Sequence, residues 1–242
     1  MNTDKKRVLI SGGSRGIGKC LCKSFCDLGY KVAFIYKSND KAASEVASST
    51  GAFMIKADIS VPAEAKNAVE RAYEYLDGFD VLVNNAGVSE IKLFTDVSDE
   101  DFSRIINTNL GGAFYLSREV AKHMIREQSG RIINIGSMWG KCGASCEVPY
   151  SASKAALRGM TMALAKELGP SGITVNCIEP GLIRTEMNAS LDDETIKGIC
   201  EDTPLMRMGE PEDVASLAVF LSSDAASFIT GQCIGVDGGF AI

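Results

Sequence analysis

The sequence predicts an α/β fold, a doubly wound parallel sheet of seven strands that residues 1–242 form as a single domain. Short apolar runs alternate with helical patterns, and a glycine-rich turn joins the first apolar run to the first helix. Polar residues follow several of the apolar runs, where a parallel sheet places its ligand sites. The chain shows no internal repeat, low-complexity segment or linker that would divide it.

Composition narrows the class of protein. Hydrophobic residues make up 45% and charged residues 23%, as in ordinary globular proteins. No apolar run approaches the ~18 residues of a membrane span, and the first residues lead straight into a strand, so we expect a cytoplasmic protein with no membrane partner. The net charge of -6 disfavours nucleic acid as a partner, because phosphate binding needs a basic surface.

The eight cysteines are scattered along the chain and do not form a disulfide framework. We interpret them as reduced, small hydrophobic residues. The only histidine is His123, and no Cys/His pair accompanies the cysteines that are four positions apart. The sequence therefore predicts no metal site.

The first strand, Arg7–Ser11, runs into a glycine turn, 12–18, and then a helical pattern that ends near Gly29. Strand, glycine turn and helix form the context of a dinucleotide site, in which backbone N–H groups and the positive helix end meet a pyrophosphate. Glycines also serve plain tight turns, so the flanking elements carry this interpretation. The turn residues expected to bind a cofactor are Gly12, Ser14, Arg15, Gly16, Ile17 and Gly18.

The end of the second strand, Lys31–Tyr36, predicts which dinucleotide binds. An acid here would hold the ribose 2′-hydroxyl of NAD, but the sequence continues with Lys37 and Ser38. With Tyr36 beside them, they are expected to meet a 2′-phosphate together with Arg15, which favours NADP(H). The alternative is that Lys37 is only a solvated surface lysine. Asp40 is also close enough in the sequence to supply an acid for the ribose 2′-hydroxyl of NAD.

Two more strands, Phe53–Lys56 and Val81–Asn84, flank a predicted helix over Pro62–Leu76. After the third strand, Asp58 is expected to accept a hydrogen bond from an adenine amine, and Ile59 beside it is expected to contact the cofactor. The fourth strand ends in an Asn-Asn-Ala-Gly turn, 84–87, at the edge where ligands bind. A plain loop is an equal alternative for this turn. The residues expected at the cofactor here are Asn85, Ala86 and Gly87.

The remaining elements follow the same alternation. A long helix is expected over 100–127 after a Ser98 cap, with Asn109 inside it, where asparagine is unfavourable without a special role. Strands are expected over 131–137, 174–178 and 232–236, a helix over Pro211–Leu221, and an irregular region over 182–209. The Ser137 hydroxyl then lies at a strand's carboxyl end.

Tyr150 and Lys154 are four residues apart at the start of a helical pattern, which places them on one face of a helix. A lysine cation within reach favours the phenolate, so we expect it to lower the pKa of Tyr150 into the range for proton transfer. For an isolated Tyr-x-x-x-Lys the alternative is a surface tyrosine and a solvated lysine.

Taken in order, these motifs resemble the short-chain dehydrogenase/reductase family over essentially the whole chain, which implies a Rossmann-like fold. The resemblance implies that Tyr150 exchanges a proton with the substrate oxygen, that Lys154 assists it and binds the nicotinamide ribose, and that Ser137 holds the substrate oxygen. Asn109 is then expected to hold a water that links Lys154 to solvent. The residues that carry the resemblance are Gly12, Gly16, Gly18, Asp58, 84–87, Asn109, Ser137, Tyr150, Lys154, Pro180, Gly181 and Thr185.

After the sixth strand, the resemblance implies that Ile183 and Thr185 contact the nicotinamide carboxamide and that Pro180 and Gly181, just before them, also lie at the cofactor. We expect the substrate pocket to be fairly apolar because Trp139, the only tryptophan, follows Ser137 by two residues. A core tryptophan is the alternative. The candidate pocket residues are Met138, Trp139, Glu147, Val148, Leu182 and Met187.

Within the family, the chain is most similar to bacterial beta-ketoacyl-acyl carrier protein reductases. This implies NADPH-dependent reduction of a 3-oxoacyl group in fatty acid synthesis, by a homotetramer. Gln128 and Ser171 stand where this group is expected to carry arginines that dock the carrier protein, although Lys122, Arg126 and Arg131 remain nearby. A free small ketone, steroid or sugar alcohol is therefore an alternative substrate. A non-catalytic NADP-binding regulator is disfavoured, because all four catalytic positions are intact.

Overall fold

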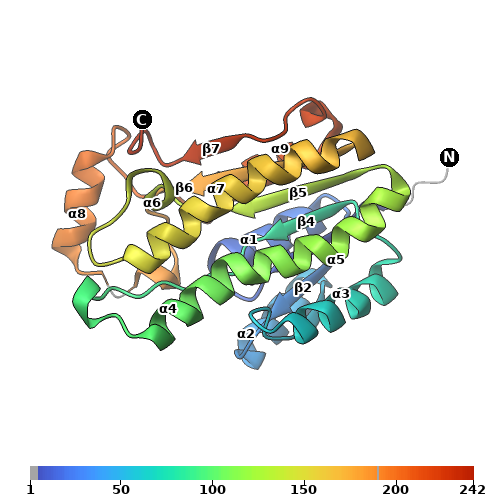
Figure 1. Cartoon of the computed structure of the whole chain (residues 1–242), viewed down its shortest axis with the longest axis horizontal. Coiled ribbons are helices and arrows are strands. Elements are labelled where there is room, and N and C mark those ends of the chain that lie inside the picture. The colour runs from blue at the N-terminus through green and yellow to red at the C-terminus, as the bar shows by residue number, and fades with distance from the viewer. Residues whose placement is uncertain (1–4, 190) are drawn as a thin grey trace.

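The computed structural model describes residues 5–189 and 191–242 of the chain. The strands form one parallel sheet in the order β3-β2-β1-β4-β5-β6-β7. Figure 1 shows α5 and α7 crossing in front of this sheet, with the strand arrowheads pointing toward α6 and α8. The strands are β1 (Arg7–Ser11), β2 (Lys31–Tyr36), β3 (Phe53–Lys56), β4 (Val81–Asn84), β5 (Gly130–Ile135), β6 (Ile173–Pro180) and β7 (Cys233–Val236).

Helices cover both faces of the sheet. The helices are α1 (Gly16–Asp27), α2 (Asp40–Thr50), α3 (Pro62–Leu76), α4 (Asp99–Ile106), α5 (Gly112–Glu127), α6 (Trp139–Cys142), α7 (Val148–Leu168), α8 (Asp193–Asp202) and α9 (Pro211–Leu221). A π-helix spans Asn107–Gly111, and short 3₁₀ turns lie at Phe94–Asp96, Gly169–Ser171, Glu186–Asn188 and Asp224–Ala226. Because parallel strands are buried on both faces, their sequences are apolar runs rather than alternations.

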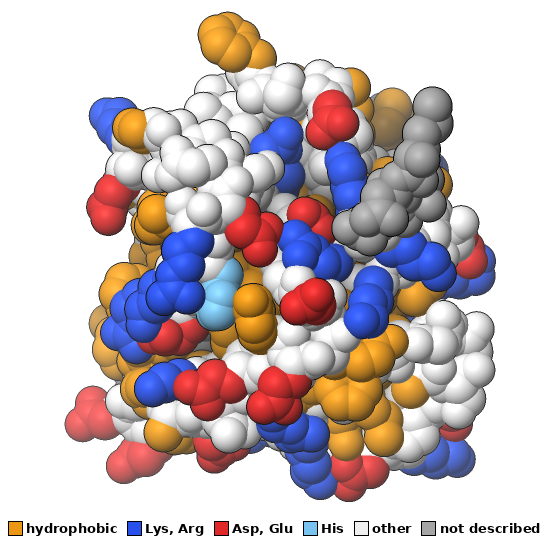
Figure 2. Space-filling view, turned by 90° about the vertical axis from the view of Figure 1, so that its right-hand side faces the viewer, with side chains coloured by type: hydrophobic (Ala, Val, Ile, Leu, Met, Phe, Trp, Pro, Cys, Tyr) orange, Lys and Arg blue, Asp and Glu red, His pale blue; other side chains and the backbone are white. Residues whose placement is uncertain are grey.

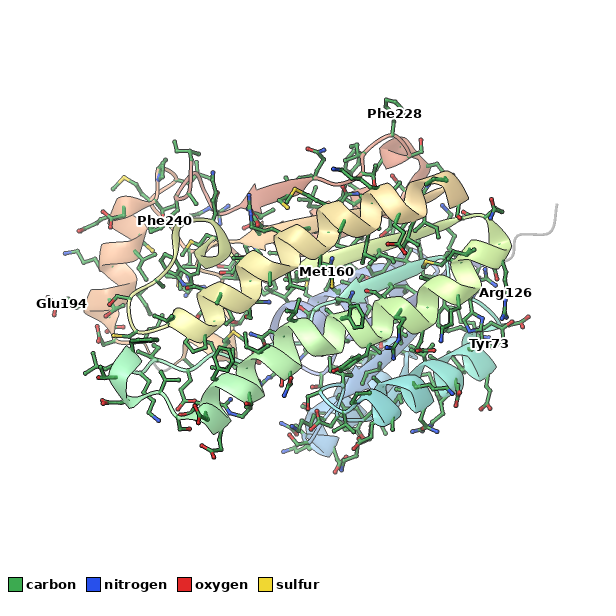
Figure 3. All side chains as sticks on the ribbon, in the orientation of Figure 1. Tyr73, Arg126, Met160, Glu194, Phe228 and Phe240 are labelled. Atoms are coloured by element: carbon green, nitrogen blue, oxygen red, sulfur yellow. The ribbon has the colours of Figure 1, made fainter. Side chains whose placement is uncertain are left out.

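The core has two parts, one on each side of the sheet. Successive residues of β1 alternate between them: Val8 and Ile10 pack against α1 and α9, whereas Leu9 packs against α3 and α5. Each of these three side chains is fully buried. The side chains that project from both layers are drawn in Figure 3. The predicted seven-stranded doubly wound sheet is confirmed, with the first four strands at their expected bounds.

The long helix predicted over 100–127 is wrong as a single element. The chain forms α4, one π turn and then α5, and Asn109 lies in the π turn. A π turn admits one extra residue, which turns a side chain that an unbroken α-helix would direct elsewhere. The capping box at Ser98, predicted as the helix start, is present: Ser98 Oγ accepts from Asp101 N at 3.1 Å.

Other bounds also differ from the prediction. β5 ends at Ile135, so Ser137 lies two residues beyond the strand. The region 182–209, expected to be irregular, contains α8, which Asp192 begins by accepting a hydrogen bond from Thr195 N at 2.7 Å. The sequence reasoning also missed α2, which Asn39 caps through Ala42 N at 3.0 Å. These short helices depend on side-chain caps rather than on apolar periodicity.

None of the helices in the described ranges 5–189 and 191–242 is both long enough and apolar enough to cross a bilayer.

Candidate active site

The glycine turn between β1 and α1 is tight enough to require glycine. Gly12 N and Gly13 N both donate to the Ile35 carbonyl, at 2.8 and 3.2 Å. A Cβ on Gly18 would lie 2.0 Å from the Gly12 oxygen, and Gly12 itself has φ +69°. The backbone therefore forms an open cradle at the amino end of α1, where N–H groups and the helix dipole favour an anion.

Asn85 and Ser11 join this turn to the end of β4. Ser11 Oγ accepts hydrogen bonds from Asn85 N at 3.0 Å and from Ala86 N at 3.1 Å. Asn85 Nδ2 donates to the carbonyls of Ser11 and Gly12, at 3.0 and 3.1 Å. β1 and β4 are neighbours where the strand order reverses, which is the position where open α/β sheets bind ligands. The sequence analysis missed Ser11, because its hydroxyl acts on backbone 74 residues away.

The end of β2 carries the two basic residues that the sequence singled out. Lys37 Nζ lies 2.6 Å from Asp58, which also accepts hydrogen bonds from Ser60. Arg15 is exposed and makes no ion pair within the described part of the chain. Asp40, the acid that could have held a ribose hydroxyl, already accepts from Tyr36 Oη at 2.9 Å and pairs with Lys56 at 2.8 Å. That pairing lowers the pKa of Asp40.

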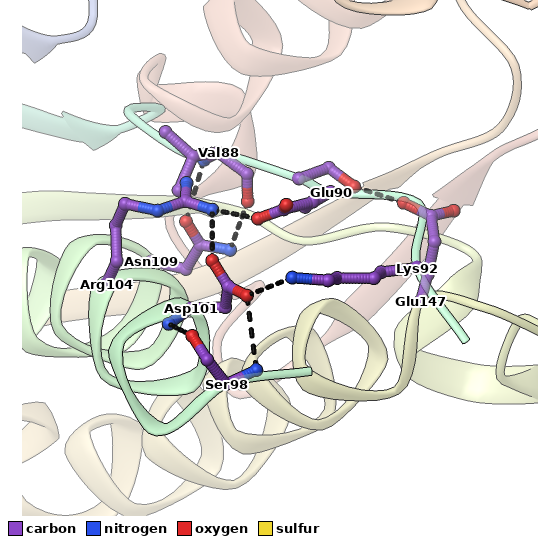
Figure 4. Close-up of polar contacts among 9 residues, drawn as sticks. Val88, Glu90, Lys92, Ser98, Asp101, Arg104, Asn109 and Glu147 are labelled. Atoms are coloured by element: carbon purple, nitrogen blue, oxygen red, sulfur yellow. Dashed lines mark hydrogen bonds and ion pairs between the residues drawn. The ribbon is translucent and has the colours of Figure 1, made fainter. Parts of the chain in front are cut away.

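Asn109 is held on both sides of its amide. Its Oδ1 accepts from Val88 N at 2.8 Å, and its Nδ2 donates to Val88 O at 2.9 Å (Figure 4). The same Nδ2 donates to Ser153 Oγ at 3.0 Å. The side chain is buried, and it ties the segment after β4 to helix α7. A Cβ on Gly87 would lie 3.5 Å from both Asn109 Oδ1 and Lys154 Nζ, so these two side chains face the same glycine.

Ser137, Tyr150 and Lys154 converge at the carboxyl end of β5. Lys154 Nζ donates to the Ile135 carbonyl at 2.7 Å and lies 5.6 Å from the centre of the Tyr150 ring. Burial lowers the pKa of Lys154 from 10.5 to about 8. Burial also raises the pKa of Tyr150 to about 12, although the Ser137 hydroxyl acts in the opposite direction.

The protein alone therefore does not lower the pKa of Tyr150 as the sequence reasoning expected. Loss of water around the phenol outweighs every favourable neighbour. The Lys154 ammonium is directed to a backbone carbonyl, not to the phenol oxygen. A raised pKa makes the phenol a weaker acid, so the Ser137 hydroxyl, which lowers this pKa, acts in the direction that proton transfer from Tyr150 needs.

A single cavity of about 1140 Å³ connects the glycine turn to these side chains. All the residues predicted to bind a cofactor line it, as does Ser137. Five of the six predicted pocket residues line it as well. Val148 does not: it begins α7 and is 43% exposed. Asn109 lies behind the cavity wall rather than in it.

The substrate end of the cavity is formed largely by residues that the sequence analysis did not single out. They come from the segment after β4, the loop before α7 and the region around α8. Trp139 was predicted here, and its ring meets Phe240 edge-to-face at 5.4 Å, so the last residues of the chain support this wall (Figure 3). The additional lining residues are Val88, Ser89, Glu90, Ile91, Thr108, Gly143, Ala144, Ser145, Cys146, Glu186, Asn188, Leu191, Asp192, Thr195 and Ile199.

Metal-capable side chains gather at one place that the sequence did not predict. Cys177 and Cys233 are paired residues of β6 and β7, and they lie with Glu179 within 4.8 Å of one another. Glu179, however, forms a salt bridge with both oxygens of its carboxylate to Arg158. This arrangement is a structural ion pair beside two neighbouring thiols, because an arginine occupies the carboxylate that a metal would need.

The chain matches the family model described as enoyl-(acyl carrier protein) reductase over residues 12–241. It is 39% identical to the 3-oxoacyl-[acyl-carrier-protein] reductase of Aquifex aeolicus, over 97% of this chain and 96% of the relative. It is 40% identical to the acetoacetyl-CoA reductase of Shinella zoogloeoides, over 96% of this chain and 97% of that protein.

A solved short-chain dehydrogenase/reductase of Serratia marcescens superposes with a TM-score of 0.92 at 33% identity, covering 100% of both chains. The chain belongs to the short-chain dehydrogenase/reductase family. A putative gluconate dehydrogenase of Agrobacterium tumefaciens is also similar, with a TM-score of 0.93 at 32% identity, over 98% of this chain and 96% of that one. Membership of this family makes the protein an oxidoreductase that works with a nicotinamide cofactor, and the glycine cradle fits that cofactor's pyrophosphate.

Proposed function

We propose that this short-chain dehydrogenase/reductase reduces a ketone to an alcohol with NADPH. The observation that carries the proposal is the convergence of Ser137, Tyr150 and Lys154 on the cavity that begins at the glycine cradle. The relatives at 39% and 40% identity are named as reductases of 3-oxoacyl and acetoacetyl groups.

The roles of the four residues follow from their contacts. A Tyr150 phenol held protonated donates its proton to the substrate oxygen, and Ser137 stabilises the charge that grows there. Lys154, buried and fixed by the Ile135 carbonyl, places a positive charge behind the tyrosine. Asn109 fixes the turn against which Lys154 rests. The cofactor, when bound, supplies the hydride.

NADP(H) is proposed over NAD(H) on the charges at the end of β2. Arg15 has no acidic partner within the described residues, and Lys37 carries only the Asp58 carboxylate against it. Asp40 is occupied by Tyr36 and Lys56, so it is not available for a ribose hydroxyl. A 2′-phosphate would therefore meet two cations here, and the adenine and ribose would lie against Tyr36, Ser38, Asp58 and Ile59.

The proposed substrate is a 3-oxoacyl thioester of fatty acid synthesis, delivered on an acyl carrier protein. The second candidate, a free small ketone, is favoured by the surface around Gln128 and Ser171. A Cβ on Gly172 would lie 2.5 Å from the Gln128 oxygen, so both positions are close in space, at the end of α7 away from Tyr150. Figure 2 looks at this end of the molecule and shows acidic side chains interspersed among the basic ones.

The basic residues that remain near this end are only partly paired. Lys122 pairs with Glu119, Arg131 shares Asp224 with Lys6, and Arg126 has no acidic partner among the described residues. The absence of arginine at Gln128 and Ser171 therefore weakens docking of an acidic carrier protein, while some positive charge remains. A homotetramer is proposed as well, because α4, α5 and α7 expose Phe102, Phe114 and Met162. A cytoplasmic location stays a prediction from the sequence.

The test is NADPH oxidation with acetoacetyl thioesters of acyl carrier protein, of CoA and of N-acetylcysteamine. Tyr150→Phe is expected to lower kcat by about 10²- to 10⁴-fold while NADPH still binds, because only the transferable proton is lost. Tyr73→Phe, on the exposed face of α3, is the matched control and should keep full activity.

A higher kcat/KM for the carrier-linked thioester than for the N-acetylcysteamine thioester would support the first substrate. Equal values would favour the free ketone. An active Tyr150→Phe enzyme would contradict the assignment of Tyr150 as the proton donor. NADPH binding without turnover of any ketone would instead favour the function of a non-catalytic NADP-binding regulator.

A further inference from the structure

The two ends of the cavity differ in charge: cations and the Asp58 carboxylate line the cofactor end, whereas the substrate end is lined by acids and, within the described residues, by no cation. The lysines and arginines that line it are Arg15 and Lys37, at the cofactor end, and Lys154 behind the tyrosine. The wall formed by the segment after β4, the loop before α7 and the region around α8 carries four carboxylates and, within the described residues, no lysine, arginine or histidine. These carboxylates are Glu90, Glu147, Glu186 and Asp192.

Three of these carboxylates have another explanation. Glu90 forms an ion pair with Arg104 on α4 (Figure 4). Asp192 caps α8 through Thr195 N. Glu186 lies across the glycine turn, because one of its oxygens would be 3.6 Å from a Cβ on Gly16, and so it belongs to the cofactor end. None of the three needs a ligand to account for its position.

Glu147 is different. Its carboxylate accepts a hydrogen bond from the Ser89 hydroxyl, and no lysine, arginine or histidine among the described residues pairs with it (Figure 4). It stands at the start of α7, but its side chain does not cap the helix. It is half-buried in the cavity wall, and this burial raises the pKa of its carboxyl. A carboxylate so placed is costly without a cation, since removal from water disfavours its charge.

The position of Glu147 relative to the reacting centre sets where a cation would lie. Glu147 comes three residues before Tyr150, and its charge acts on the Tyr150 phenol by raising the pKa of that group. Glu147 immediately precedes α7, and its side chain lines the same cavity as Tyr150. A substrate that presents its carbonyl to Tyr150 would therefore meet Glu147 a few bonds further along its chain.

We propose that, under the second candidate function, the preferred free ketone carries a protonated amine, bound by Glu147 with Ser89 beside it. This inference rests on the proposed ketone reduction and names its substrate class. An ammonium at this point supplies the charge-assisted hydrogen bond that the carboxylate lacks. The Glu147 carboxylate also disfavours a free ketone whose chain ends in a carboxylate. The pocket, expected from the sequence to be fairly apolar, is thus lined by the apolar Trp139 and also by the charged Glu147.

Three matched methyl ketones test the inference. Each has three methylenes after the carbonyl: 5-(dimethylamino)-2-pentanone is a cation, 6-methyl-2-heptanone is its neutral isostere, and 5-oxohexanoate is an anion. The tertiary amine cannot cyclise onto the carbonyl as a primary amine would. In the wild-type protein, kcat/KM with NADPH is expected to be at least about tenfold higher for the cation than for the neutral ketone, with the anion lowest.

The variant that sharpens the test is Glu147→Gln, which keeps the shape and removes the charge. It is expected to bring the cation-to-neutral ratio of kcat/KM close to one, mainly through KM. Glu74→Gln is the control: this exposed residue of α3 loses the same charge outside the cavity and should keep the wild-type ratio. Thermal unfolding of each variant confirms that it is folded.

The outcomes separate the two proposals. Reduction of the neutral ketone or the anion in preference to the cation, or a ratio that Glu147→Gln does not change, would overturn the role of Glu147 and leave ketone reduction standing. No turnover of the three ketones or of any acetoacetyl thioester, with NADPH bound, would overturn the proposed function itself.

Discussion

The cofactor end and the substrate end of the cavity are built in different ways. At the cofactor end, the glycine turn and the ends of β1, β2 and β4 meet, and backbone groups and glycines form most of the binding surface. At the substrate end, the loop before α7 and the region around α8 supply side chains from irregular segments. A site made by backbone at strand ends is common to a whole fold, whereas one made by loop side chains belongs to the individual protein.

The strongest test of this difference is Gly18→Ala. The added Cβ would lie 2.0 Å from the Gly12 oxygen, so the turn must open before it can hold a cofactor. We expect the Kd for NADPH, measured by quenching or enhancement of fluorescence, to rise at least about 100-fold, together with a loss of stability.

Gly198→Ala is the matched control, because a Cβ on this α8 glycine would meet no atom of the described residues within 4 Å. It should leave NADPH binding intact. A Gly18→Ala protein that binds NADPH as tightly as the wild type would show that the turn is not the cofactor cradle.

The boundary between the two ends is Lys154, and its burial predicts a pH dependence of stability. The pKa of Lys154 is lowered from 10.5 to about 8, so between these values the unfolded chain binds more protons than the folded one. The free energy of unfolding should therefore rise with pH across this window, by up to about 3 kcal/mol relative to a variant without the amine.

The measurement is denaturant unfolding of the wild type and of Lys154→Met at about pH 7.5 and 10. The difference between the two proteins isolates Lys154 from the cysteines and tyrosines that titrate nearby. The free energy of unfolding of the wild type should rise relative to that of Lys154→Met as the pH rises. A constant difference would mean that the amine is not desolvated.

The smallest effect concerns the charges at the end of β2. Arg15→Ala is expected to lower the ratio of kcat/KM for NADPH over NADH by about tenfold, the size of one charge-assisted hydrogen bond. Lys37→Ala should lower it less, because Lys37 also serves Asp58 at 2.6 Å.

Lys19→Ala removes a charge from α1 outside the cavity and should leave the cofactor ratio as it is. The reverse order, with Lys37 dominant, would show that the Asp58 pair breaks when the cofactor binds.

The contrast also explains what the sequence could predict. The strands follow from short apolar runs, the glycine turn from the glycines over 12–18, and the pairing of Tyr150 with Lys154 from their spacing of four residues. Each of these patterns is local in the sequence. The π turn at Asn109 could not be read in this way, since it depends on Val88 and Ser153, 21 and 44 residues away. The helix α8 escaped because its signal was a cap at Asp192 and not an apolar stripe.

The substrate end was predicted less well for the same reason. Trp139 and Glu147 were found by their position in the chain, but Ser89 and Glu90 reach the cavity from a segment without periodicity. The pocket was expected to be apolar because of Trp139 alone, without its neighbours in space. That no cation among the described residues lies beside Glu147 can be seen only once the lining residues of the cavity are known together.

The central claim, hydride transfer to a keto carbon, is tested most directly with NADPH that carries deuterium on the transferable position of its nicotinamide ring. The enzyme would be given equal amounts of the acetoacetyl and crotonyl thioesters of N-acetylcysteamine, and the products read by mass spectrometry. We predict one deuterium on the alcohol carbon of a 3-hydroxybutyryl thioester and unchanged crotonyl thioester. Deuterium in a butyryl thioester instead would mean that the site reduces carbon–carbon double bonds and would contradict this account.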